Sequence, residues 1–266
     1  MTIWRFFKNK WMLLWIPFTV IIFIVAFVVY LFLSLPDISD LKSLNPKKTA
    51  FMVMRIRQAE KKGTEYAIRH NWMPFVHIPQ LLKETVRIAE DAGFYWHRGI
   101  DFEELKEAIK KNIQEKKFTR GGSTITQQLA KNLYLSTKKS LFRKIKEYLI
   151  ARKLEKTLSK DRIFELYLNV IELGPGVFGI QAASQYYFGC SAAELTLEEI
   201  VRLVAVLPRP LSTDPREDGQ WLKWRCRWLL HKLQLYGYIS EETYQEIVGI
   251  FKNDVIEQRD LTFSHD

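Results

Sequence analysis

Two adjacent carboxylates beside a group of aromatic residues are the first feature of this sequence that could do chemistry. They lie in EDAGFYWHRG, residues 90–99, where Glu90 and Asp91 come before the rings and His97 follows them. Keeping a charge among rings is unfavourable unless it has partners or a chemical task. Partial burial would also raise the pKa of Glu90 and make it a stronger base. The stretch therefore marks this pair as candidate functional residues.

A second candidate stretch is GGSTITQQLAKN, residues 121–132. Thr124 and Gln127 have the spacing of a capping box, which predicts the start of a helix. On that helix Thr124, Gln128 and Lys131 share one face, close to the free N–H groups that attract anions at a helix N-terminus. The alternative is an ordinary capped helix with a solvated polar face. The spacing alone leaves both interpretations open, and it is not that of a P-loop.

The third candidate stretch is RKIKE, residues 143–147, in which Arg143 and Glu147 are neighbours on one helix face. Such a pair at the surface contributes only about 0.3–0.5 kcal/mol. The nearby RKLE, residues 152–155, has similar charges. Sequence physics alone therefore favours a surface ion pair over a functional one.

The elements that would position these residues are mostly helices, because helical periodicity dominates and both Gly (12) and Pro (9) are scarce. A short extended pair is predicted between Met54 and Pro79. The fold class is predicted as mainly α. The helices are expected at Phe102–Lys117, Thr124–Leu135, Leu141–Leu158, Lys160–Val170, Leu197–Val206 and Trp221–Tyr236.

The stretch from Trp11 to Leu35 contains no charged residue and predicts a single transmembrane anchor. As a helix it would be about 37 Å long, enough to cross a bilayer. A cleaved signal peptide and a buried core helix are the alternatives, but the apolar stretch is too long for the first and no cleavage site follows it. Basic residues flank both ends, so orientation depends on topology, and a large C-terminal domain favours an N-terminus inside the cell.

The predicted organisation follows from this anchor. It consists of an N-terminus at 1–10, the anchor at 11–35, a linker at 36–49, one domain at 50–250 and a polar tail at 251–266. Trp221 to Tyr238 mixes tryptophans with basic residues, as a membrane contact would. A terminal helix that packs its apolar face is favoured instead, because such amphipathic helices are common. Cys190 and Cys226 lack metal-binding spacing, and either a disulfide or two free thiols fits them.

The net charge of +10 requires an anionic partner, such as nucleic acid, acidic lipid or a phosphorylated substrate. Nucleic acid is disfavoured, because an anchor with its N-terminus inside places the basic domain on the other side of the membrane. Charge alone does not choose between acidic lipid headgroups and a phosphorylated substrate.

Four stretches in this order resemble the signature blocks of the peptidoglycan glycosyltransferases of family 51. They are EDAGFYWHRG, GGSTITQQLAKN, RKIKE and KDRIFELYLN (residues 160–169). The resemblance extends from about residue 49 to about residue 215, through GVFGIQAASQYYFG and AVLPRPLSTDP. No penicillin-binding domain follows in this sequence, so the resemblance is to the monofunctional biosynthetic members.

The resemblance implies a lysozyme-like helical domain on the outer, periplasmic face of the bacterial plasma membrane. It implies that lipid II is polymerised into glycan strands, with cell-division or elongation proteins as further partners. Glu90 and Glu147, 57 positions apart, match the family's two catalytic glutamates, which selects Glu147 over Glu155. The residues matching the substrate-binding positions are Asp91, Phe94, His97, Ser123, Thr124, Gln128, Lys131, Asn132, Arg143 and Lys144.

The implied reaction transfers the growing chain from a lipid pyrophosphate to the 4-hydroxyl of lipid II, with inversion. Glu90 would act as general base, with Asp91 and His97 holding the local geometry, and Phe94 fits a packing role as well as a substrate contact. Lys131, Arg143 and Lys144 would offset the leaving group's charge. Glu147 would orient these cations or hold a divalent ion, Mg²⁺ or Mn²⁺, although no cofactor is required.

Two rival functions remain. A muramidase or lytic transglycosylase also uses a glutamate on a lysozyme-like fold, but it has no need for a cationic pyrophosphate site. A membrane-anchored, non-catalytic scaffold would not require both glutamates and the GGSTITQQ block to be intact, as they are here.

Overall fold

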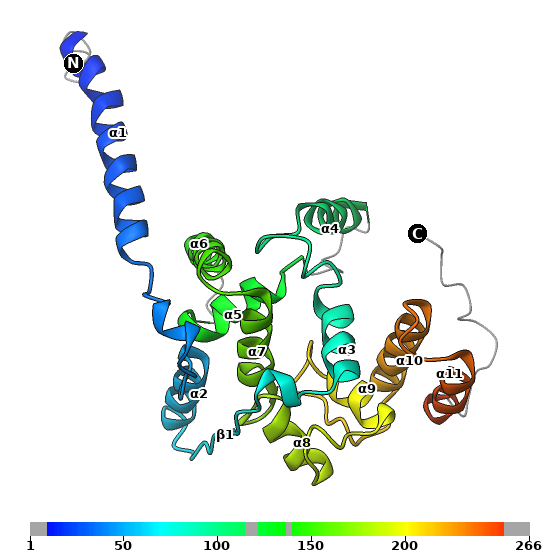
Figure 1. Cartoon of the computed structure of the whole chain (residues 1–266). Coiled ribbons are helices and arrows are strands. Elements are labelled where there is room, and N and C mark those ends of the chain that lie inside the picture. Colours follow the sequence, from blue (N-terminus) through cyan, green and yellow to red (C-terminus); the bar gives the residue numbers. More distant parts are fainter. Residues whose placement is uncertain (1–9, 115–121, 137–139, 253–266) are drawn as a thin grey trace. The chain divides into compact units, whose positions relative to one another are not determined.

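The computed structural model describes residues 10–114, 122–136 and 140–252 (Figure 1). The chain divides into two compact units, Met1–Asp37 and Ile38–Asp266. The end of the helix predicted to reach Lys117, the first glycine of GGSTITQQLAKN and most of the predicted polar tail lie outside the described residues.

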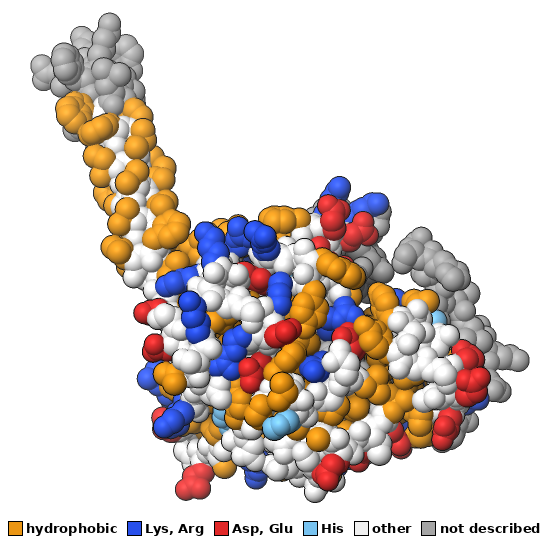
Figure 2. Space-filling view, in the orientation of Figure 1, with side chains coloured by type: hydrophobic (Ala, Val, Ile, Leu, Met, Phe, Trp, Pro, Cys, Tyr) orange, Lys and Arg blue, Asp and Glu red, His pale blue; other side chains and the backbone are white. Residues whose placement is uncertain are grey.

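The first unit contains one helix, α1 (Lys10–Leu33). Most of its described side chains, among them Phe23 and Phe32, are apolar and exposed (Figure 2). Within the part of the chain that the structure describes, no helix is long and apolar enough to cross a membrane. The predicted helix is therefore confirmed, and its passage through a membrane is not.

The second unit is mainly helical, as predicted. Its α-helices are α2 (Ala50–Glu60), α3 (Gln80–Glu90), α4 (Phe102–Gln114), α5 (Ile125–Tyr134), α6 (Leu141–Thr157), α7 (Lys160–Val170), α8 (Ile180–Phe188), α9 (Leu197–Ala205), α10 (Gln220–Leu235) and α11 (Glu241–Val248). Short 3-10 helices lie at Ser39–Lys42, Phe75–His77 and Gly249–Phe251. Three short strands, β1 (Arg69–His70), β2 (Glu172–Gly174) and β3 (Val177–Phe178), form a sheet in the order β1-β3-β2.

The strand prediction was wrong in two respects. Met54 lies inside α2 rather than in a strand, and β1 has no partner nearby in the sequence. Instead β1 pairs in parallel with β3, which pairs antiparallel with β2. A two-residue strand depends on its distant partner, so the local pattern between Met54 and Pro79 could not define it.

Helix α5 is the central element of the second unit and packs against α2, α6 and α7 (Figure 1). Its predicted apolar face is buried, because Ile125 and Leu129 are 0% exposed and Leu133 is 7% exposed. The predicted capping box also forms, with Thr124 accepting from the Gln127 N–H while the Gln127 side chain accepts from the Thr124 N–H. Sequence therefore fixes where α5 begins and which face it buries.

Helix α10 packs against α3, α9 and α11 and closes the other side of the unit (Figure 1). It buries Leu222, Leu229 and Leu233, in agreement with the terminal-helix interpretation of this segment. Beyond α11, Phe251 is fully buried, and the Arg202 guanidinium lies 5.0 Å from the centre of its ring. The last described residues are therefore part of the packed core.

The cysteines are two free thiols rather than a disulfide. Cys226 is buried in α10, and burial raises the pKa of its thiol to about 12. Cys190 is half-buried and its sulfur lies near the Ser184 hydroxyl. The Cys226 thiol therefore stays protonated and is unsuited to nucleophilic chemistry, so packing accounts for this residue.

Most of the segment predicted as a linker, from Ile38 onward, is part of the second unit. Ile38 and Leu41 are buried. The Arg162 guanidinium donates to the carbonyl groups of Leu41 and Leu44 and to the Asn45 side chain. At least the part from Ile38 to Asn45 is therefore held by packing and hydrogen bonds.

Asn169 links α7 to the chain before α3. Its Oδ1 accepts from the Met73 N–H at 2.7 Å, and its Nδ2 donates to the carbonyls of Met73 and Glu165, both at 2.9 Å. We expect Asn169→Ala to lower the free energy of unfolding by about 2–4 kcal/mol, because buried backbone groups lose their partners. Chemical denaturation measures this. Asn71→Ala, at an exposed side-chain pair, should change it by less than about 0.5 kcal/mol, and equal losses would contradict the assignment.

Candidate active site

Glu90 is the last residue of α3 and points toward α5. Its Oε2 accepts a hydrogen bond from Gln128 Nε2 at 2.8 Å, and the Tyr167 hydroxyl donates to Gln128 Oε1 at 3.3 Å. Burial raises the pKa of Glu90, while the Gln128 hydrogen bond and the charges of Arg225 and Lys131 act in the opposite direction. Glu90 is thus a carboxylate with a raised pKa that a hydrogen bond holds in one orientation.

Asp91 and His97 bond to each other. Asp91 is 9% exposed, and its Oδ1 lies 2.9 Å from His97 Nε2. The Gly99 N–H donates to His97 Nδ1, so Nε2 carries the proton that faces Asp91. Asp91 Oδ2 also accepts from the Ile125 N–H at the start of α5. The pair therefore fixes the loop after Glu90 onto α5, the geometric role expected from the sequence.

The backbone conformation of Gly99 explains why EDAGFYWHRG ends in a glycine. Its φ is +87°, a conformation that favours glycine, and an added Cβ would lie 3.2 Å from Glu155 Cγ. Its carbonyl accepts from Thr124 Oγ1 at 2.8 Å. Thr124 is 3% exposed and therefore acts as helix cap and loop anchor, with little surface left for a substrate.

Phe94 is a core residue. It is 0% exposed, with its ring centre 5.4 Å from that of Phe164 and the Lys160 ammonium 4.3 Å from its own. The packing alternative is therefore the one observed. Glu155, the rejected candidate for the second glutamate, accepts from Lys160 and from Thr126, so its carboxylate belongs to the same buried structure.

Glu147 is buried, at 3% exposure, so the surface ion-pair interpretation is wrong. Its Oε2 accepts from Arg143 Nη1 at 2.6 Å and its Oε1 from Lys144 Nζ at 2.5 Å. Lys144 Nζ also donates to Ser123 Oγ at 2.9 Å. Buried Arg143 Nε has no hydrogen-bond partner among the described residues. Glu147 therefore holds two cations in place, and one of them retains a free donor.

The charge of Lys131 is influenced by both glutamates, Glu90 and Glu147. Burial lowers the pKa of its ammonium, while the negative charges of Glu147 and Glu90 raise it and the positive charges of Arg143 and Lys144 lower it. One ammonium is thus within electrostatic reach of both carboxylates. Glu90 of α3, Lys131 of α5 and Glu147 of α6 are therefore electrostatically coupled.

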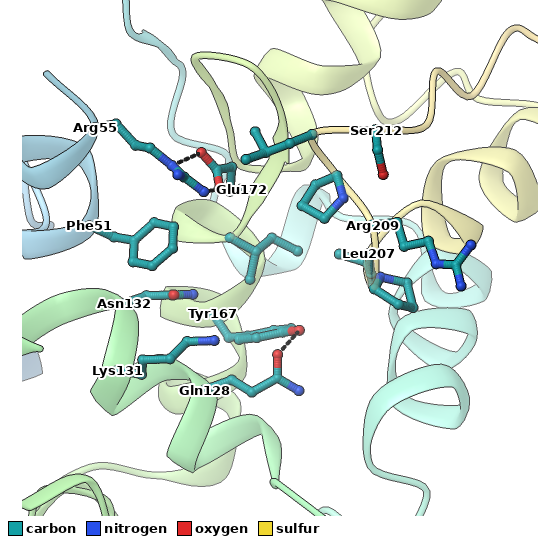
Figure 3. A pocket seen from close by; sticks show the side chains of 14 residues that line it. Phe51, Arg55, Gln128, Lys131, Asn132, Tyr167, Glu172, Leu207, Arg209 and Ser212 are labelled. Carbon is teal, nitrogen blue, oxygen red and sulfur yellow. Dashed lines mark hydrogen bonds and ion pairs between the residues drawn. The ribbon is translucent and has the colours of Figure 1, made fainter. Parts of the chain in front are cut away.

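A pocket of about 410 Å³ lies beside Lys131 (Figure 3). Lys131 and Asn132 reach it from α5. Arg209 lines it from the loop after α9, with its guanidinium turned away and 4.5 Å from the centre of the Trp221 ring. Arg55 lies across from them, already paired with Glu172 at 2.6 Å. The full lining is Phe51, Arg55, Gln128, Lys131, Asn132, Tyr167, Ile171, Glu172, Leu207, Pro208, Arg209, Pro210, Leu211 and Ser212. This pocket therefore offers positive charge and amide donors next to Gln128, the partner of Glu90.

Sequence reasoning missed three residues at this site. Tyr167 fixes Gln128, Arg209 lines the pocket, and Arg225 acts on Glu90 from α10. KDRIFELYLN and AVLPRPLSTDP carried the first two, although no residue was singled out in them. Arg225 stood among tryptophans, and only the membrane and packing roles of that segment were considered.

Asp91, His97 and Asp101 form a compact group whose potential ligand atoms lie within 4.8 Å of one another. Asp91 and His97 bond to each other, and Asp101 Oδ1 caps α4 by accepting from the Glu104 N–H. Because these atoms have protein partners, we interpret the group as a hydrogen-bonded unit. The divalent ion expected near Glu147 stays a prediction.

Comparison with known proteins identifies the family. The family described as Transglycosylase matches residues 49–234. Proteins named biosynthetic peptidoglycan transglycosylase from Nitrosospira multiformis and Herminiimonas arsenicoxydans are 40% and 39% identical, over 86% and 84% of this chain and 97% and 95% of their own. One from Dechloromonas aromatica is 45% identical over 67% of this chain and 78% of its own. The chain belongs to the transglycosylase family.

Proposed function

We propose that this protein is a peptidoglycan glycosyltransferase that polymerises glycan strands from lipid II during synthesis of the bacterial cell wall. The observation that carries the proposal is a pocket lined by Lys131 and by Gln128, the hydrogen-bond partner of Glu90. The charges of Glu90 and Glu147 both act on Lys131. The names of the relatives support the reaction class. Neither rival function explains why so many cations surround the two glutamates.

In the proposed reaction, Glu90 removes the proton from the 4-hydroxyl of lipid II as that oxygen attacks the anomeric carbon of the growing chain. The bond from that carbon to the lipid pyrophosphate breaks on the opposite face, which inverts the anomeric centre. The hydrogen bond from Gln128 orients the carboxylate. Burial of Glu90 strengthens it as a base, since its charged form is less well solvated than in water.

The leaving pyrophosphate takes up the electron pair and requires positive charge. Lys131, Arg143 and Lys144 supply it. Both Glu147 oxygens are occupied by cations, which supports its role in orienting them. A divalent ion at Glu147 would have to displace one of these partners.

We also propose that the enzyme acts at the cell envelope, with α1 as anchor and the second unit on the periplasmic face. The uncharged stretch from Trp11 to Leu35 and the exposed apolar side chains of α1 support this (Figure 2). Lys and Arg side chains gather over α6 (Figure 2). Such a basic surface would be attracted to anionic headgroups, where a lipid-linked substrate is found.

The test is a polymerisation assay with labelled lipid II, run beside an incubation with purified cell-wall sacculi. Glycan strands from lipid II and no release of fragments from sacculi are expected. Fragment release without polymerisation would establish the hydrolytic rival. Activity on neither substrate, from protein that is folded by circular dichroism, would favour the scaffold.

The polymerisation rate should fall on acidification at a pH above that expected for an ordinary glutamate. The reason is that Glu90 must be deprotonated to act, and burial raises its pKa. The rate therefore has its full value above this pKa and is lost as pH falls through it. The measurement is the initial rate against pH at saturating lipid II, and an acidic limb at the position of a solvent-exposed glutamate would contradict the assignment.

A further inference from the structure

Arg225 is a half-buried arginine of α10 that lies against the end of α3. Its Nη2 donates to the Ala89 carbonyl at 3.3 Å, one residue before Glu90. Its guanidinium lies 4.2 Å from the ring centre of Trp228. Its buried Nε has no hydrogen-bond partner among the described residues. A backbone bond and a ring thus hold this charge in position, and no carboxylate bonds to it in the described part of the chain.

The charge that compensates Arg225 is Glu90. Burial lowers the pKa of Arg225, and the Glu90 carboxylate raises it. The effect is reciprocal, because Arg225 opposes the rise in the pKa of Glu90 that burial causes. Arg225 donates to the neighbouring carbonyl and makes no hydrogen bond to the Glu90 carboxylate, whose Oε2 is held by Gln128.

We propose that Arg225 is a positioning residue of the transfer reaction, which places a positive charge beside the general base Glu90 and fixes the end of α3 without bonding to the carboxylate. The inference rests on the proposed function for its role in catalysis. The effect of the Arg225 charge on the pKa of Glu90 does not depend on the substrate.

The other groups facing Glu90 come from separate elements and have other tasks. Lys131 of α5 acts on both glutamates and faces the pocket, so it is suited to the departing pyrophosphate. Tyr167 of α7 is neutral, because burial raises its pKa well above the ordinary value. Asp91, next in the chain, disfavours a second negative charge at Glu90. Of the two cations whose charges act on Glu90 among the described residues, Lys131 is also influenced by Glu147 and Arg225 is not.

The test compares Arg225→Gln with Arg225→Lys, which retains the charge. Arg225→Met keeps the apolar stem and is a second neutral variant should the first fail to fold. Arg227→Gln is the matched control, since Arg227 lies on the same helix but donates to the Phe251 carbonyl. Initial rates with lipid II are measured from acidic to alkaline pH for all of them.

Loss of the charge should raise the pKa of Glu90, so the acidic limb of the rate profile should move to higher pH. We expect the neutral variants to lose about tenfold in rate on that limb and much less on the alkaline plateau. Arg225→Lys and Arg227→Gln should keep the wild-type limb. A loss that is equal at every pH, or an unmoved limb in both neutral variants, would show a purely structural role.

An infrared titration of isotope-labelled glutamate carboxyls, with Glu90→Gln as blank, follows the protonation of Glu90 without substrate. It should show the same upward shift in the neutral variants. An unmoved titration would overturn the inference. Because this measurement needs no lipid II, a wild-type protein inactive in polymerisation would count against the proposed function alone.

Discussion

Replacement of Glu90 by glutamine is expected to abolish glycan polymerisation while the protein remains folded and binds its substrate. A positioned general base contributes about 10²–10⁴ to the rate, so the loss should be at least a hundredfold. Glutamine has nearly the shape of glutamate and its amide oxygen can still accept the hydrogen bond from Gln128. The change therefore removes the basic oxygen and little else.

The measurement is the initial rate of strand formation from labelled lipid II, with the fold checked by thermal melting. Glu84→Gln is a matched control, because Glu84 lies on the same helix and pairs with Arg87 away from the pocket. It should polymerise at close to the wild-type rate. A Glu90→Gln protein with near wild-type activity would remove Glu90 from the role of base.

Lys131→Ala should weaken binding of a lipid-linked pyrophosphate by about ten- to a hundredfold. Hydrogen bonds to charged groups contribute about 1.5–3 kcal/mol, and Lys131 reaches the pocket from α5 (Figure 3). The variant also leaves Glu90 and Glu147 without the ammonium they share, so the rate should fall together with the affinity.

Calorimetric titration with undecaprenyl pyrophosphate in detergent micelles measures the affinity. Lys156→Ala serves as control, because this lysine is exposed near the end of α6 and does not line the pocket. Its affinity should match the wild type. If Lys131→Ala bound the pyrophosphate as tightly as the wild type, the lysine would have no place in the site.

Local sequence signals were sufficient for α5. The capping box at Thr124 marks its start, and the apolar residues at steps of four define the buried face. The same holds for α6 and α7, whose capping serines, Ser140 and Ser159, accept from backbone N–H groups in the first turn. Short-range hydrogen bonds and hydrophobic periodicity determine these helices, so they can be predicted from the sequence.

Burial of the charged residues could not be predicted in this way. Arg143 and Glu147 have the spacing of a surface pair, and only the packing of α5 on α6 makes Glu147 a buried residue. The role of Arg225 likewise depends on α10 meeting α3, far apart in the chain. Resemblance to a family could select Glu147, but the physical reason for it comes from tertiary structure.

The contact of Phe251 with α9 and α10 has a consequence for anyone who excises this enzyme. The match to the transglycosylase family stops at residue 234, yet Phe251 fills a core position, with Arg202 against its ring and Arg227 bonded to its carbonyl. The segment that matches the family and the packed core of the second unit therefore end at different residues. A fusion or minimal protein cut at the end of the matching segment would open a hole beside α10, the helix that carries Arg225.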